Sequence, residues 1–480
     1  MNKVLVAIFL FSSIFSAVAE ELPDFGDPSG TAISPQQLSK IGKRMMRYLR
    51  RKKLLVKDPL VNQYLTSLGY KLVAHSDQAN KKFTFFVVND SSINAFAAPG
   101  RYIGINRGLM TTANSESELA AVMAHEVAHI TQHHLPRMFA ANKRRSLAST
   151  IALLAVLAAG GGNRDVQKAG IAISAAARAQ LAINFTRGNE SEADHVGIRI
   201  LSAAGFDPAA MAVFFERLQK AGRLYGNRTP EFLRTHPVSS RRIADARLRL
   251  KNLPKTKTRE SLNFALMKAR LIVLAARNPS RVINKIKKNL KAGYILNKKA
   301  AWYALVLAYT RSSQYKKASV LLNKLSRDDP TRLAYIIAEA EIATRRKNLR
   351  LVKAVYDNAT ALYPNNPVVT YFQTNSLLQL GQNRSALNVI RKYNSNASNT
   401  MTSELHSLYA TAAGKAGSRG EAYHQRAEYF YRNGYLRSAI YQLTRASQEK
   451  NMDFYLSSKI ESRLRQLKSE AKFHKIKIPK

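Results

Sequence analysis

The sequence contains no cysteine among its 480 residues. This absence excludes a disulfide scaffold, a cysteine-ligated zinc or iron–sulfur site and a thiol nucleophile. Any metal ion must therefore be bound by histidine, aspartate or glutamate. At about 100–200 residues per domain, a chain of this length is expected to form two or three folded units.

Long hydrophobic runs are also missing, apart from a short one near the start. Lys3 precedes an apolar segment from Val4 to Phe15, and Ala17-Val18-Ala19 has the small–x–small pattern of a cleavage site. This arrangement predicts a signal peptide over residues 1–19 and a periplasmic product, either soluble or peripheral. No later segment reaches the about 20 apolar residues that a membrane-spanning helix needs.

Acidic residues are scarce, because 31 Asp and Glu stand against 76 Lys and Arg, for a net charge of +45. Such an excess favours nucleic acid, an anionic membrane surface or an acidic protein as partner. Since the protein is expected to be exported, we predict no nucleic-acid partner. Peripheral contact with an anionic membrane and a merely solvated basic surface both remain open.

Two regions of the chain differ in their sequence patterns. Residues 20–253 mix helical patterns with two strand-like runs, Phe83–Val88 and Tyr102–Ile105. Residues 254–480 are helical throughout, and the segment Asn252-Leu253-Pro254-Lys255 is the best candidate boundary.

The second region contains a repeat of tetratricopeptide spacing. Pro330 and Pro364 each end a unit of 34 residues, which is the length of this repeat. Small and large apolar residues stand at the expected positions between them: Ile336, Ala340, Ala343, Tyr356 and Ala359. The pattern predicts a helical solenoid that binds polypeptides in a concave groove. The alternative is an ordinary helical bundle with chance spacing.

The motif that carries chemistry is His125-Glu126-Val127-Ala128-His129, on a helix predicted from the capping residues Ser115 and Glu118. Histidines four residues apart share a helical face and can bind one zinc ion. Glu126 lies about 100° further round the helix, which suits a general base that reaches water.

A third ligand is available in Asn189-Glu190-Ser191-Glu192-Ala193-Asp194 on a second predicted helix. Glu190 can complete a site of two histidines and one glutamate, with Asp194 one turn further on. The alternative is a helix start enriched in acids, as we expect for Glu192. A zincin plan with a third histidine downstream fails, because Gln132 and Leu135 occupy the glycine and histidine positions. His133 and His134 are expected to be polar residues at the helix end.

These motifs, followed by Gly205-Phe206-Asp207-Pro208 and Thr235-His236-Pro237, resemble the HtpX/CAAX-endopeptidase family of gluzincins. A signal peptide and carboxy-terminal tetratricopeptide repeats resemble the periplasmic branch of that family. The resemblance implies a mainly α fold, in which an α+β gluzincin peptidase domain precedes a tetratricopeptide-repeat solenoid. It also implies one zinc ion per subunit on His125, His129 and Glu190, with Glu126 as catalytic base and Asp194 as proton donor.

The same resemblance implies a periplasmic metalloendopeptidase with chaperone-like activity. Its expected substrates are unfolded or misassembled outer-membrane proteins, and its repeats are expected to dock to the β-barrel assembly machinery. The alternative is a non-proteolytic repeat scaffold for envelope assembly.

Two further expectations concern the peptidase site. The Tyr102–Ile105 strand is a candidate edge along which an extended substrate pairs. His236 lies in a predicted loop, with three open roles: a fourth zinc ligand that blocks the site, a donor to the oxyanion, or a structural contact with the next helix.

Overall fold

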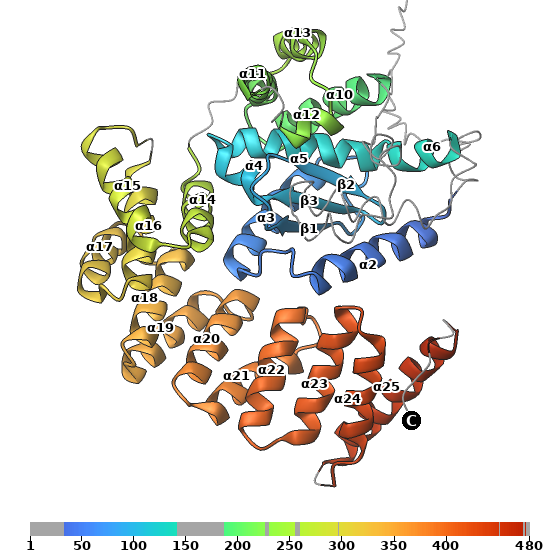
Figure 1. Cartoon of the computed structure of the whole chain (residues 1–480), viewed down its shortest axis with the longest axis vertical. Helices are drawn as coiled ribbons and strands as arrows, with labels where there is room; N and C mark the ends of the chain where they lie inside the picture. The colour runs from blue at the N-terminus through green and yellow to red at the C-terminus, as the bar shows by residue number, and fades with distance from the viewer. Residues whose placement is uncertain are drawn as a thin grey trace, which may run out of the picture.

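The computed structural model describes residues 33–141, 187–225, 230–254, 260–295, 297–450, 452–473 and 476. The predicted signal peptide over residues 1–19 lies outside these residues. The chain forms a mixed α/β unit followed by an array of helices, and Figure 1 shows that this array curves beneath the first unit. None of the described helices combines the length and hydropathy that a membrane span requires.

A three-stranded sheet lies in the first unit. Its strands are β1 (Thr84–Val88), β2 (Ala95–Ala98) and β3 (Tyr102–Asn106), in the order β1-β3-β2. β3 pairs in parallel with β1 and antiparallel with β2. The first and third strands agree with the sequence pattern, whereas the Ala-rich β2 was not predicted, because alanine has little intrinsic preference for strands.

The position of β3 corrects one expectation. This strand lies between its two neighbours, so both of its edges are already paired and it cannot accept a substrate strand. The edge strands are β1 and β2. The outer side of β1 already accepts contacts from Leu55 and Val56, whereas no described residue forms a bridge with the outer side of β2.

Helices surround this sheet. Their bounds are α2 (Pro35–Arg51), α3 (Pro59–Val73), α4 (Arg107–Thr112), α5 (Glu116–Thr131), α6 (His134–Ala141), α10 (Arg187–Ala203), α11 (Ala209–Tyr225), α12 (Glu231–Thr235) and α13 (Ser240–Arg249), then the 3₁₀ turn η2 (Leu250–Asn252).

The start of α5 follows the predicted cap. The hydroxyl of Ser115 accepts a hydrogen bond from the backbone N–H of Glu118 at 3.2 Å. The Glu118 carboxylate accepts from the backbone of Asn114, one residue before the expected partner, at 2.6 Å. Nearly every residue of α5 is buried, so the motif helix runs through the core.

The second unit confirms the tetratricopeptide-type solenoid. A residue in the left-handed region separates paired helices at Ser313, Lys347 and Gly381, at intervals of 34 positions. The helices are α14 (Leu262–Ala275), α15 (Pro279–Lys291), α16 (Lys298–Arg311), α17 (Tyr315–Asp328), α18 (Leu333–Arg345), α19 (Leu349–Leu362), α20 (Pro367–Gln379), α21 (Asn383–Ser395), α22 (Ser403–Lys415), α23 (Arg419–Arg432), α24 (Leu436–Ser447) and α25 (Phe454–Phe473).

The two units are joined by extensive contacts. One hydrophobic core runs from α3 and α5 into the first repeat helices. Within this joint, the buried guanidinium of Arg270 on α14 bonds Asp58 at the start of α3 at 2.8 Å and Glu341 on α18 at 3.0 Å. At the other end of the array, Arg50 of α2 donates to the backbone oxygen of Arg432. The boundary at residues 253 and 254 therefore separates two architectures that share a core, and it stays a prediction as a domain limit.

Candidate metal centre

Two closely packed helices supply most of the site. α5 carries His125, Glu126 and His129, and α10 carries Glu190 and Asp194. Gly197 permits the close approach, because a Cβ there would lie only 3.1 Å from the backbone nitrogen of His125. The small residue thus sets the distance between the histidine pair and the acids of α10.

The three predicted ligands converge in the protein interior. The Nε2 atoms of His125 and His129 lie 3.0 Å apart. The Glu190 carboxylate approaches them at 3.5 Å and 3.4 Å, respectively. All three side chains are buried, at 2% exposure or less.

His236 adds a fourth nitrogen to this cluster. Its Nδ1 lies 3.3 Å from His125 Nε2 and 3.0 Å from Glu190 Oε1. The ring stacks on Phe232 of α12 with 4.9 Å between centroids, and the His236 backbone N–H donates to the Phe232 carbonyl. His236 does not cap the following helix, because that role belongs to Ser239.

The donor set fits a zinc ion. One ligand atom from each of His125, His129, Glu190 and His236 lies within 4.8 Å of the others. Tetrahedral zinc with bonds of about 2.0–2.1 Å places its ligands about 3.3 Å apart. Five of the separations between these ligand atoms, at 3.0–3.5 Å, bracket that value.

Contacts on the outer side of the cluster suit both motif histidines to a metal. His125 Nδ1 lies 3.0 Å from Asp194 Oδ1, so this nitrogen carries the proton and Nε2 keeps its lone pair. His129 Nδ1 lies 2.7 Å from His134 Nδ1, whose Nε2 faces Glu192 at 3.1 Å. When His129 Nδ1 donates to His134 Nδ1 and His134 Nε2 donates to Glu192, His129 Nε2 keeps a lone pair that faces the cluster.

Asp194 is held by Arg242, which no sequence motif marks as a site residue. Arg242 on α13 donates two hydrogen bonds to Asp194 at 2.7 Å and 2.8 Å, and a third at 2.8 Å to the carbonyl of Pro237. Its Nη1 also lies 2.8 Å from Glu190. Burial would raise the pKa of Asp194, but hydrogen bonds from Arg242 and His125 lower it below its ordinary value. Arg242 therefore ties together the α10 acids and the loop that carries His236.

Glu126 lies between the metal cluster and the edge strand. Its Oε1 is 3.4 Å from His236 Nε2. Burial raises its pKa, and the nearby imidazoles of His236 and His125 and the backbone of Ala97 in β2 offset this only partly. A raised pKa suits a base that must take up a proton during the reaction.

The contacts of His134 and Glu192 revise their expected roles. Burial lowers the pKa of His134 to about 4, so this fully buried imidazole is neutral. Glu192 is partly exposed and bonds both His134 and Arg137. His134 contacts His129 from five residues away, whereas Glu192 lies 58 positions beyond His134, so sequence spacing gave no signal for this carboxylate. His133, in contrast, is exposed.

Comparisons with known proteins agree with this geometry. The model of "Peptidase family M48" matches residues 59–250. The chain is 32% identical to the beta-barrel assembly-enhancing protease of Escherichia coli strain K12, over 95% of this chain and 92% of that protein. It is 29% identical to the protein of the same name in Yersinia pestis, over 93% and 91% of the two chains. It is also 29% identical to the mitochondrial metalloendopeptidase OMA1 of Schizosaccharomyces pombe, over 38% of this chain and 50% of that protein.

Proposed function

The chain belongs to peptidase family M48 as a zinc metalloendopeptidase, and from this premise we propose that His125, His129 and Glu190 bind the zinc while Glu126 is the general base. The observation that carries the assignment is the convergence of these three ligands beside Glu126 in a buried site. A zinc ion in this position supplies Lewis acidity to the scissile carbonyl and lowers the pKa of water.

The protein's own groups perform the proton transfers. Glu126 removes a proton from the attacking water and passes it to the leaving amine, as its raised pKa allows. Asp194 and the His134–Glu192 pair hold the two imidazoles in the metal-binding tautomer. A general base of this kind is worth about 100- to 10,000-fold in rate.

For Asp194 we propose a positioning role instead of proton donation. Its carboxylate is engaged by both Arg242 and His125, and its pKa is lowered. A group that holds its proton so weakly is a poor acid. The contact with His125 Nδ1 gives it a direct effect on zinc affinity instead.

For His236 we propose a reversible block of the metal centre. Its Nδ1 lies 3.3 Å from His125 Nε2 and 3.0 Å from Glu190 Oε1, a spacing that would let it take the fourth position on zinc in place of water. The same position does not favour a permanent oxyanion donor, because an Nδ1 that served as a zinc ligand could not also donate a hydrogen bond to the oxyanion. Movement of the loop that Arg242 anchors through Pro237 would open the site.

The substrate is proposed to lie along β2 as an added strand. Main-chain hydrogen bonds to this edge accept many sequences, which suits a protease that acts on unfolded chains. Ala97 of β2 lies against Glu126, so a peptide on this edge passes the base.

The biological role that we propose is periplasmic. Relatives named for enhancement of β-barrel assembly match nearly the whole chain, repeats included. We infer that this protein assists outer-membrane β-barrel assembly and degrades misassembled outer-membrane proteins. Its repeats would dock to the assembly machinery, and its net charge of +45 would favour contact with an anionic membrane surface.

A trapping experiment tests this role. The full-length Glu126→Gln protein, produced in the envelope and cross-linked, should retain outer-membrane β-barrel precursors and assembly proteins. Soluble periplasmic proteins in their place would contradict the role. A second candidate, the non-proteolytic scaffold, is favoured if Glu126→Gln restores envelope integrity as fully as the unmodified chain.

A further inference from the structure

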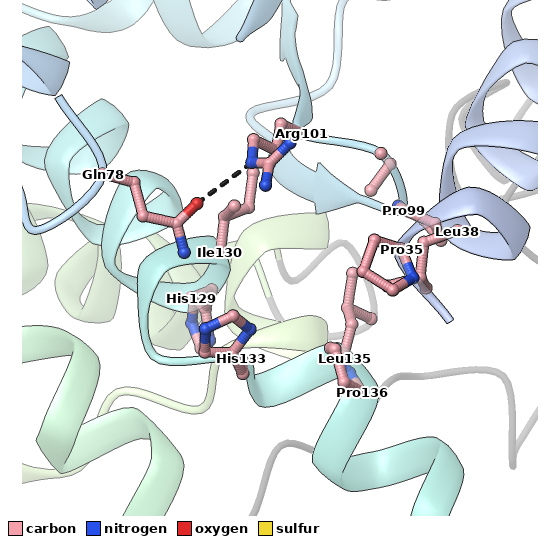
Figure 2. A pocket seen from close by; sticks show the side chains of 12 residues that line it. Pro35, Leu38, Gln78, Pro99, Arg101, His129, Ile130, His133, Leu135 and Pro136 are labelled. Carbon is pink, nitrogen blue, oxygen red and sulfur yellow. Dashed lines mark hydrogen bonds between the residues drawn. The ribbon is translucent and has the colours of Figure 1, made fainter. Parts of the chain in front are cut away.

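A partly enclosed cavity of about 90 Å³ lies beside the metal centre. His129, a proposed zinc ligand, forms part of its wall. Figure 2 shows the cavity between the start of α2, the turn that follows β2, the end of α5 and the start of α6. The cavity thus shares a wall with the site already described.

Most of the lining is apolar. It includes Leu38 of α2, Ala98 and Pro99 at the end of β2, Ile130 of α5, and Leu135 and Pro136 of α6. On one side, Arg101 donates a hydrogen bond to Gln78 at 3.0 Å (Figure 2). An aliphatic group would gain free energy here, whereas a lysine or arginine would lose solvation and meet the charge of Arg101.

The cavity begins where the edge strand ends. Ala98 is the last residue of β2 and also lines the cavity. A peptide paired along β2 would pass Glu126 near Ala97, and its side chains beyond Ala98 would lie beside the cavity. We propose that this cavity binds one aliphatic side chain of the substrate at a fixed position near the scissile bond, and that Leu38 and Leu135 set the size it accepts. The inference rests on the proposed function, because it assumes a peptide on β2.

The dimensions limit the occupant. A cavity of about 150 Å³ holds a benzene molecule. At about 90 Å³ the cavity suits valine, leucine, isoleucine or methionine rather than phenylalanine or tryptophan.

The α2 wall cannot easily move away. A Cβ at Gly42 would lie 2.1 Å from the Pro99 carbonyl oxygen, so α2 is in direct contact with the turn after β2. Gly100 in that turn also approaches α2, with an added Cβ 3.1 Å from Ser39 Cα. Leu38 is therefore fixed at the cavity although it belongs to neither metal-binding helix.

Substitution of Leu38 tests the size rule. With the zinc-loaded full chain and a synthetic peptide library, mass spectrometry should find aliphatic residues enriched at one position near the cleaved bond. Leu38→Phe should shift that position towards alanine and glycine, lowering the leucine-to-alanine ratio of kcat/KM by about 10- to 100-fold. Leu38→Ala should admit phenylalanine. Lys40→Ala, an exposed change on the same helix, should leave the profile unchanged.

Binding provides a readout that does not need hydrolysis. A peptide-display library selected on the zinc-loaded Glu126→Gln protein should show the same aliphatic preference, and Glu126→Gln with Leu38→Phe should lose it. Identical profiles for folded wild type, Leu38→Phe and Leu38→Ala would overturn the inference and leave the peptidase function standing. Selective binding without any cleavage by the unmodified chain would instead support the cavity and contradict the proposed catalysis.

Discussion

His236 Nδ1 and Glu190 Oε1 lie 3.0 Å apart at the metal centre, although 46 residues separate them in the chain. In the proposed block, His236 would compete with water for the fourth position on zinc. We expect His236→Ala to keep zinc on the remaining three ligands and to raise peptide cleavage by about tenfold. A rise of this size is expected if His236 blocks the site in about nine molecules of ten. Steady-state cleavage and zinc content by mass spectrometry measure the two effects.

A decrease in cleavage would assign His236 a different role. If His236→Ala lowers cleavage while zinc is retained, His236 stabilises the transition state. Phe232→Leu, which removes the ring stacked on His236 but no ligand, should also raise cleavage, to a smaller extent.

A second experiment should distinguish the zinc ligands from the general base. Alanine at His125, His129 or Glu190 should lower zinc occupancy, because each removes one of the converging ligand atoms. Glu126→Gln should keep zinc and reduce kcat by about 100- to 10,000-fold, since it removes only the base. Full activity in Glu126→Gln would exclude the mechanism.

The sequence predicted the parts of the site that depend on local spacing. His125 and His129 share a helical face by periodicity alone, and Ser115 marked the start of their helix. The contact of Arg242 with Asp194 was not predicted, because 48 residues separate the two and it depends on how α13 packs. The contact between His134 and His129 spans only five residues, but it depends on how α6 turns back after α5. β2 was missed because its four residues owe their strand conformation to pairing with β3.

The carboxylates that hold the motif histidines should differ in their effect on zinc affinity. Asp194→Asn should reduce zinc affinity by about 10- to 100-fold, since the carboxylate that orients His125 loses its charge. Glu192→Gln should have a smaller effect, because Glu192 acts on His129 only through His134. Glu216→Gln is the control, as Glu216 pairs with Arg247 outside the site. Zinc titration against a competing chelator measures the order, and equal affinities for Asp194→Asn and Glu216→Gln would remove Asp194 from the site.

Arg270 should be essential to the joint between the peptidase unit and the repeats. Its side chain is 2% exposed, and Asp58 and Glu341 depend on it for charge balance. Arg270→Met leaves both carboxylates without their cation, so we expect the free energy of unfolding to fall by about 3–5 kcal/mol. Lys299→Met breaks an exposed pair with Asp328 and should change the free energy of unfolding far less, because solvent screens that pair. Urea unfolding followed by circular dichroism compares them, and equal midpoints would refute a structural role for Arg270.

A buried histidine in the repeats, His406, should make the array sensitive to acid. His406 Nδ1 lies 2.7 Å from the Gln425 carbonyl oxygen, so this nitrogen carries the proton. Its buried Nε2 has no hydrogen-bond partner among the described residues. Burial lowers the pKa of His406 to about 4, and Arg432 and Arg463 oppose its protonation while Glu428 favours it.

The sign of the pH effect follows from these contacts. The folded-state pKa of His406, about 4, lies below the ordinary 6.5, so the unfolded chain takes up the proton first as the pH falls. The contribution of neutral His406 to the free energy of unfolding is fully present above pH 6.5. It is lost between pH 6.5 and 4, which amounts to about 3 kcal/mol. His406→Asn keeps a donor towards Gln425 but cannot titrate, so its free energy of unfolding should fall less than that of the wild type between pH 7.5 and 4.5. Urea unfolding at both pH values measures the difference, with exposed His75→Asn as the control. If His406→Asn and the wild type lose the same stability over this range, His406 is not the acid-sensitive group of the array.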